Sequence, residues 1–267
     1  RAAIAALAQQ QKWEAPHLNE KVIEAFELAA RTEEDFRLMS EAGVTVIRVG
    51  ESVWARWQPE PNRFDLDWLE PILDRAYANG IGVILGTPTY AVPRWVFIDH
   101  PSVIAHHATG APVAYGHRQN VDYSSVEFRA LCEPLITKIV ERYASHPSII
   151  GWQIDNEPGA YLLHNDGVFD SFKDSLRDEY GSIDGLNAAW GLTYWSHALR
   201  DFEDLWRPDG NTNPSYLLAW RKHQARLTNE FLQWQRDLVR KLIAPGQFIT
   251  TCVAINRPGM DTFSIGE

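Results

Sequence analysis

The stretch Ser148-Ile149-Ile150-Gly151-Trp152-Gln153-Ile154-Asp155-Asn156-Glu157-Pro158-Gly159 decides the fold of this chain. Its first half is a short apolar run, which is typical of a strand buried on both faces of a parallel sheet. The run ends where polar residues begin, so Asn156 and Glu157 are predicted at the carboxyl end of the strand. In a barrel of parallel strands this end carries the chemistry. Glu157 is therefore a candidate acid.

A helix followed by a strand recurs along the rest of the chain. Thr32 and Asp35 form a capping box for a helix that Gly43 ends, and a strand is predicted directly after it. The four predicted strands span 44–49, 81–85, 148–155 and 247–254. A long helix is predicted near 215–242, and a helical stripe of Phe128, Leu131, Leu135, Ile139 and Tyr143 precedes the third strand. This alternation predicts an α/β fold with a parallel sheet.

The domain organisation follows from where this regular pattern begins. Residues 1–31 are predicted to be an N-terminal helical segment that Pro16 divides into two pieces. Residues 32–267 are predicted to be part of a (β/α)8 barrel, since the loops after the strands are long, as on the working face of such a barrel. Four strands cannot close a barrel of eight.

Composition excludes several classes of partner. The chain has 267 residues and a formal net charge of −10, which argues against nucleic acid and anionic membranes, because both select basic surfaces. A neutral substrate fits better. No basic-then-apolar signal opens the chain and no apolar run approaches the ~20 residues of a membrane span. We therefore expect a cytoplasmic location.

The sequence suggests neither a metal site nor a cofactor. Cys132 and Cys252 lie far apart without the spacing of a zinc site or a disulfide framework, so buried thiols are expected. His106 and His107 are adjacent and therefore point in different directions on most backbones, and no third ligand accompanies them.

Three blocks carry a resemblance to a known family. They are Trp152 to Glu157, Gly50-Glu51-Ser52-Val53-Trp54-Ala55-Arg56 and Leu85-Gly86-Thr87-Pro88-Thr89-Tyr90. Together they resemble glycoside hydrolase family 42, the β-galactosidases, over about residues 32 to 267. The resemblance implies that the predicted strands are strands two to five of the barrel. It also implies that the proton donor ends the fourth strand and that the nucleophile, at the end of the seventh, lies outside this chain.

The resemblance assigns roles to the residues around the strand ends. Glu157 corresponds to the acid/base, and Asn156 to the residue that hydrogen-bonds the sugar 2-hydroxyl. Arg118, in Gly116-His117-Arg118-Gln119-Asn120-Val121-Asp122, matches an arginine that reaches into the sugar subsite. From the residues alone, Glu157 could instead be a solvated loop residue, Asn156 a helix cap and Arg118 a member of a loop salt bridge.

Three further substrate-binding residues are predicted in the same way. Arg48 and Glu51 resemble the pocket-floor pair at the end of the second strand, although they could equally form a structural ion pair. Trp195, in Trp190-Gly191-Leu192-Thr193-Tyr194-Trp195-Ser196, matches the aromatic wall of the substrate funnel.

The family's cysteine cluster, which binds structural zinc, is absent. Its first position corresponds to Asp122, and the later ones fall near Asp166, Val168 and Ser171, none of which supplies a thiolate. No bound zinc is therefore expected.

These observations predict a retaining, exo-acting β-galactosidase that releases terminal β-D-galactose, present here as a fragment that is inactive alone. The full-length protein is expected to be a homotrimer. One alternative is another barrel glycosidase, such as a glucosidase or arabinosidase. A second alternative is a non-catalytic sugar-binding fragment, which the missing strands favour.

Overall fold

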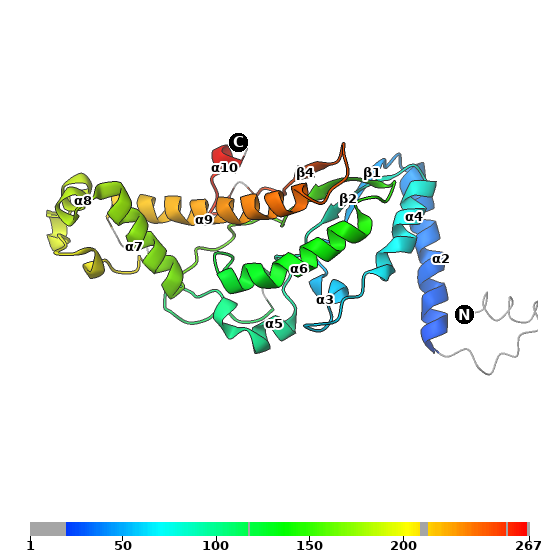
Figure 1. Ribbon diagram of the computed structural model, residues 1–267, viewed down its shortest axis with the longest axis horizontal. Coiled ribbons are helices and arrows are strands. Elements are labelled where there is room, and N and C mark those ends of the chain that lie inside the picture. The colour runs from blue at the N-terminus through cyan, green and yellow to red at the C-terminus, as the bar shows by residue number, and fades with distance from the viewer. Residues whose placement is uncertain (1–19, 117, 209–212, 255, 266–267) are drawn as a thin grey trace, which may run out of the picture.

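The computed structural model describes residues 20–116, 118–208, 213–254 and 256–265, and its strands form one parallel sheet (Figure 1). The strands are β1 (Val46–Val49), β2 (Gly82–Gly86), β3 (Ile149–Gln153) and β4 (Phe248–Thr250). They lie in the order β1-β2-β3-β4, and all three neighbouring pairs are parallel. The four predicted strands are confirmed at their predicted places.

Helices connect these strands and extend beyond them. The α-helices are α2 (Glu20–Glu41), α3 (Trp54–Trp57), α4 (Glu70–Ala78), α5 (Arg94–Asp99), α6 (Val126–Tyr143), α7 (Asp166–Tyr180), α8 (Ile183–Trp190), α9 (Pro214–Arg240) and α10 (Thr262–Ile265). Short 3₁₀ turns are η2 (Asp67–Leu69), η3 (Pro101–Val103), η4 (Tyr194–Ser196) and η5 (Phe202–Asp204). The predicted break at Pro16 lies outside the described residues.

The helix start predicted at Thr32 is wrong. Helix α2 begins by Glu20 and continues through Thr32 to Glu41, so the capping-box pattern of Thr32 and Asp35 lies inside a helix. The prediction failed because the residues before Thr32 also favour a helix, and a position inside a continuous helix needs no N-cap. The predicted end is confirmed, because Gly43 follows α2 with a φ of 77°.

The crossover helices begin and end at residues suited to those positions. The Ser125 side chain accepts a hydrogen bond from the backbone N–H of Phe128 and so caps α6. The Asn213 side chain accepts from the N–H groups of Ser215 and Tyr216 at the start of α9. Helix α4 is followed by Gly80, whose φ of 68° only glycine adopts readily.

Two hydrophobic clusters share the long helix α9. The first joins one face of the sheet to the crossover helices, and Val83, Leu85 and Trp152 are fully buried in it. The second lies around α7, α8 and the first part of α9. In Figure 1, α9 runs from the end of the molecule that carries α7 and α8 to the end that carries the sheet. Val46 and Phe248 remain 43% exposed on the two outer strands, as an open sheet requires.

Candidate active site

The predicted acid lies in a sharp turn where β3 ends. Asp155 and Glu157 both have positive φ values, 53° and 47°, which non-glycine residues seldom adopt. Two contacts hold this backbone: the N–H of Asn156 donates to Asp155 Oδ1 (2.7 Å), and the N–H of Glu157 donates to the carbonyl of Cys252 (2.9 Å). Strain that is held by such bonds is typical of functional sites. The turn directs Glu157 beyond the carboxyl end of the sheet.

Two arginines bind the Glu157 carboxylate. Nη2 of Arg118 lies 2.5 Å from Oε2, and Nη2 of Arg257, from the segment after β4, lies 2.7 Å from the same oxygen. The hydrogen bond from Arg257, and next the charges of both arginines, hold the pKa of Glu157 below its ordinary value. A proton donor must stay protonated near neutral pH, which requires a raised pKa. The two arginines shift the pKa of Glu157 in the opposite direction, toward the ionised form.

Arg118 reaches Glu157 because its loop is fastened to the turn. The neighbouring Gln119 has a φ of 58° and its Nε2 donates to the carbonyls of Asn156 and Glu157, both at 2.5 Å. The structure therefore brings together Arg118, Asn156 and Glu157. Arg118 thus forms a salt bridge from its loop, which was the alternative, and its contact with a sugar stays a prediction.

Arg48 and Glu51 lie at the carboxyl end of β1. Nη2 of Arg48 is 3.4 Å from Glu51 Oε1, and its Nη1 donates to Gln153 Oε1 at 2.8 Å. Gly86 permits the approach of this loop, since a Cβ at that position would lie 2.4 Å from the Cβ of Glu51. The pair is thus an ion pair that also joins β1 to β3. Its contact with a sugar stays a prediction.

Asn156 is buried beneath the acid. Only 5% of the residue is exposed, and its Oδ1 accepts a long hydrogen bond (3.4 Å) from Gln153 Nε2. It caps no helix here, so that alternative is not what the structure shows. Its side chain is fixed beside Glu157 and close to the polar end of β3.

Trp195 is not brought to this site in the described structure. It lies in η4, beyond α8, which is at the opposite end of the molecule from the sheet (Figure 1). Its ring is 70% exposed and stacks on Tyr194 at a centroid distance of 5.6 Å. The physical reason is that residues 166–208 pack on α9 as part of the second cluster and extend away from β3. Its role as a funnel wall stays a prediction.

A buried polar group supports the turn, and the sequence did not reveal it. Oγ1 of Thr89 donates to Asp155 Oδ2 (2.6 Å), and Oγ1 of Thr87 accepts from the N–H of Asp155 (2.8 Å). Thr87 also donates to Oε1 of Gln235 on α9 (2.7 Å). Burial raises the pKa of the Asp155 carboxyl, while the Thr89 hydrogen bond opposes this effect. The signal available in the sequence was the Thr-Pro-Thr pattern directly after β2.

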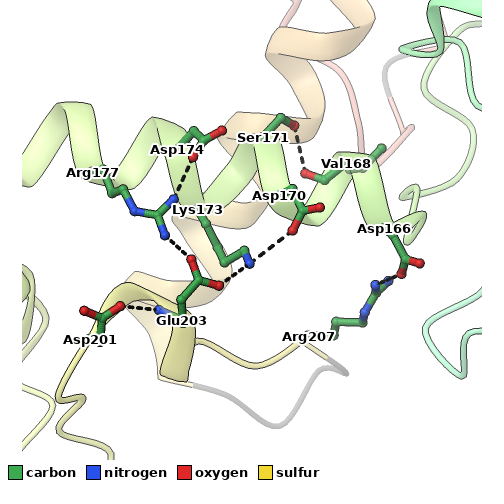
Figure 2. Close-up of polar contacts among 10 residues, drawn as sticks. All are labelled: Asp166, Val168, Asp170, Ser171, Lys173, Asp174, Arg177, Asp201, Glu203 and Arg207. Atoms are coloured by element: carbon green, nitrogen blue, oxygen red, sulfur yellow. Dashed lines mark hydrogen bonds and ion pairs between the residues drawn. The ribbon is translucent and has the colours of Figure 1, made fainter.

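Three positions of the family's cysteine cluster, Asp122, Asp166 and Ser171, line one pocket, but their donors do not fit zinc. Asp122 Oδ1 accepts from the N–H (3.0 Å) and hydroxyl of Ser124. Figure 2 shows Asp166 paired with Arg207, and the Ser171 hydroxyl directed to the carbonyl of Val168 (2.9 Å). In the described ranges no three His, Cys, Asp or Glu side chains form a group that could hold a metal ion.

The same region is held by ion pairs. Glu203 in η5 contacts both Lys173 (2.7 Å) and Arg177 on α7, as Figure 2 shows. These pairs fasten the loop after α8 to α7.

Within the residues that could be searched, no helix is long and apolar enough to cross a membrane.

Comparisons with known proteins agree with this arrangement. A family model described as β-galactosidase, of the glycoside hydrolase 42 group, matches residues 26–267. A curated β-galactosidase of Thermus sp. is 35% identical over 244 residues, which are 89% of this chain and 38% of that protein. One from Clostridium cellulovorans is 32% identical over 222 residues, or 82% of this chain and 34% of that protein. The chain thus spans little more than a third of the length of these relatives.

Solved structures give the same result for the fold. A β-galactosidase of the psychrophilic Marinomonas ef1 superposes with a TM-score of 0.81 at 30% identity, covering 89% of this chain and 37% of that one. One from the haloarchaeon Halorubrum lacusprofundi gives 0.82 at 30% identity, covering 89% and 36%. The predicted fold class is confirmed: the chain is part of a (β/α)8 barrel.

Proposed function

This chain belongs to glycoside hydrolase family 42, the β-galactosidases, and we propose that it supplies the acid/base side of a retaining, exo-acting β-galactosidase. Glu157 is the proposed acid/base, and Arg118, Asn156, Arg48 and Glu51 are its proposed sugar-binding neighbours. The substrate is a terminal, non-reducing β-D-galactoside. The proposed assembly of the full-length protein is a homotrimer, and its proposed location is the cytoplasm.

One observation supports this proposal most strongly. Glu157 follows β3 in a strained turn that is held by hydrogen bonds of Thr87 and Thr89 to Asp155, and this position after a parallel strand supports the proposed role of its carboxylate. A retaining glycosidase needs a second carboxylate about 5–5.5 Å from the first. We propose that this nucleophile belongs to a part of the barrel outside these 267 residues, since the chain spans only 38% of the Thermus relative.

The ion pairs of Glu157 indicate how the second carboxylate acts on the first. Two guanidinium groups on one carboxylate leave an excess positive charge. A nucleophilic carboxylate beside Arg118 would take up one of these arginines, and its own negative charge would raise the pKa of Glu157. The residue would then become a competent proton donor. In this chain the two arginines lower the pKa of Glu157 and so favour the ionised form, which suits a general base.

A second candidate is a sugar-binding fragment without catalysis; the described ionic partners of Glu157, two arginines and no second carboxylate, favour it for the chain alone. A third is another β-glycosidase of the same barrel type. Titration calorimetry of the 267-residue chain with galactose, alongside nitrophenyl β-galactoside turnover, separates binding from catalysis. To separate the sugars, the chain can be joined to the remaining barrel of the Thermus relative and assayed on nitrophenyl galactoside, glucoside and arabinoside. Preference for glucoside or arabinoside would contradict the galactosidase proposal.

A further inference from the structure

The segment after β4 is fastened to the Glu157 turn at several points. Besides the bond from Glu157 N–H to the Cys252 carbonyl, the N–H of Gly259 donates to the carbonyl of Gly159 (3.2 Å). From the other side, Oγ1 of Thr228 on α9 donates to the Gly259 carbonyl (2.7 Å). Arg257 lies between these anchor points, so its backbone has a fixed position relative to Glu157.

The contact between Gly159 and Gly259 depends on glycine at the first position. Gly159 has a φ of 72°, and a Cβ there would lie 2.5 Å from the carbonyl oxygen of Gly259. A side chain would therefore push the two backbones apart, because a carbonyl oxygen cannot rotate away as a flexible side chain can. The sequence at this position permits the approach that brings Arg257 to Glu157.

The two arginines on Glu157 are held differently. The side chain of Arg118 is 50% exposed, whereas that of Arg257 is 24% exposed. Nε of Arg257 is buried and has no hydrogen-bond partner in the described part of the chain. Its position is therefore set by the backbone contacts and by Glu157, not by a better hydrogen-bonding arrangement elsewhere.

We infer that Arg257 is a positioning residue for Glu157: it holds Oε2 of the carboxylate and so fixes the orientation of the group. This inference rests on the proposed role of Glu157 as the acid/base. Arg118 is more exposed, so another anion can take the place of Glu157 as its partner. Arg257 then remains paired with Glu157.

The charged groups that face Glu157 come from two elements. Arg118 belongs to the loop before α6 and Arg257 to the segment after β4, and no other described ionic side chain lies within ion-pair distance of it. Asp155 is buried in the same turn and bonded to Thr89, so it is not in contact with the Glu157 carboxylate. The hydrogen bond from Arg257 has the largest effect on the pKa of Glu157, and it lowers this pKa.

The test is a ¹³C NMR titration of the Glu157 carboxyl in the 267-residue chain, assigned by the loss of its signal in Glu157→Gln. At pH 4.5, the ordinary pKa of a glutamate, the wild-type carboxyl should remain mostly ionised. In Arg257→Gln the signal should move toward the protonated position, and by more than in Arg118→Gln. Arg257→Lys, which keeps the charge, should restore part of the difference.

Two further variants sharpen the result. Gly159→Ala keeps Arg257 but separates the two backbones, so it should shift the titration in the same direction, and it supplies the comparison should Arg257→Gln fail to fold. Arg200→Gln removes an exposed arginine that pairs with Asp204, and it should leave the signal unchanged. Near-UV circular dichroism at pH 4.5 confirms that folded chains are compared.

A Glu157 signal that is the same in wild type, Arg257→Gln and Gly159→Ala would overturn the inference. An effect of Arg118→Gln that exceeds that of Arg257→Gln would do so as well. The titration reads the carboxyl itself and not hydrolysis. Preference of the joined enzyme for glucoside or arabinoside would contradict the proposed function and leave this result standing.

Discussion

Oγ1 of Thr89 donates a 2.6 Å hydrogen bond to Oδ2 of Asp155, and this bond joins the segments that follow β2 and β3 beneath the candidate acid. Both residues are almost fully buried, at 1% and 4% exposure. A carboxyl group in such surroundings needs donors, because water is not available to it. The pair therefore fixes the turn from which Glu157 projects.

Replacement of Thr89 by Val should destabilise the chain. Valine has nearly the same shape but lacks the hydroxyl, so Asp155 would lose a donor while it stays buried. We expect the free energy of unfolding to fall by about 1–3 kcal/mol, the range for leaving a buried polar group unpaired. Urea denaturation followed by circular dichroism measures it. Thr193→Val, at an exposed position, is the matched control and should change stability by less than about 0.5 kcal/mol.

Most of the sheet could be predicted from the sequence, because its apolar runs are continuous and bounded by turn residues. The residues at which the strands end could not be predicted. β3 stops at Gln153 although the apolar pattern continues through Ile154, since Asp155 takes up a positive φ that ends the extended backbone. This φ depends on the bonds to Thr87 and Thr89, which lie more than sixty residues away in the chain.

The site was predictable only where a motif marked it. Glu157, Asn156 and Arg118 lie in recognisable blocks and meet as expected. Arg257 lies in no such block, and it reaches Glu157 across 100 residues of sequence because Gly159 and Gly259 allow their backbones to touch. No local pattern encodes that approach. Likewise, the local pattern predicted a helix start at Thr32, but this residue lies inside the longer helix α2.

His223 should make stability fall as the pH is lowered. It is buried between α7 and α9, its Nε2 bonds to the Ser171 hydroxyl (3.0 Å), and Arg226 lies beside its Nδ1. Burial, and then the charge of Arg226, lower its pKa from 6.5 to about 4. Between these two values the unfolded chain binds the proton and the folded chain does not, so stability is complete above pH 6.5 and is lost as pH falls toward 4.

The loss from His223 amounts to about 3 kcal/mol at most, from the size of this pKa difference. Urea midpoints at pH 7 and pH 4.5 should therefore differ less in His223→Gln than in wild type. His107→Gln, which removes an exposed histidine, should keep the wild-type difference. Equal pH dependence in His223→Gln and wild type would show that His223 is not buried as described.

Glu157→Gln, made in the chain joined to a complete barrel, should slow hydrolysis of galactosides with poor leaving groups by about 10²–10⁴-fold, the usual contribution of general acid catalysis. Galactosides with good leaving groups need little protonation and should lose less. Initial rates on lactose and on dinitrophenyl galactoside give the comparison. Equal losses for both would exclude Glu157 as the proton donor.

Purified chain should contain no stoichiometric zinc. Asp122 is hydrogen-bonded to Ser124 and Asp166 is paired with Arg207, while Val168 supplies no ligand at all. Thiolates, which bind zinc most strongly, are missing from these positions. Elemental analysis after dialysis without chelator measures this directly. One zinc per chain would contradict the prediction.

The 267 residues alone should not hydrolyse β-galactosides. Retention requires two carboxylates close together, and the described partner groups of Glu157 are two arginines and no acid. Glu51 is the strand-end glutamate that could substitute, but it is paired with Arg48, which also binds Gln153. The arginines on Glu157 also lower its pKa, which disfavours the protonated form that a proton donor needs.

The open sheet strengthens this expectation. Val46 and Phe248 are 43% exposed on the outer strands β1 and β4, so the described residues leave both edges of the sheet open. Unpaired edges of this kind also promote association. The assay is nitrophenol release from the β-galactoside by the folded chain, with Glu157→Gln as its control. Turnover near that of a full-length relative, abolished in Glu157→Gln, would mean that a nucleophile lies within these residues.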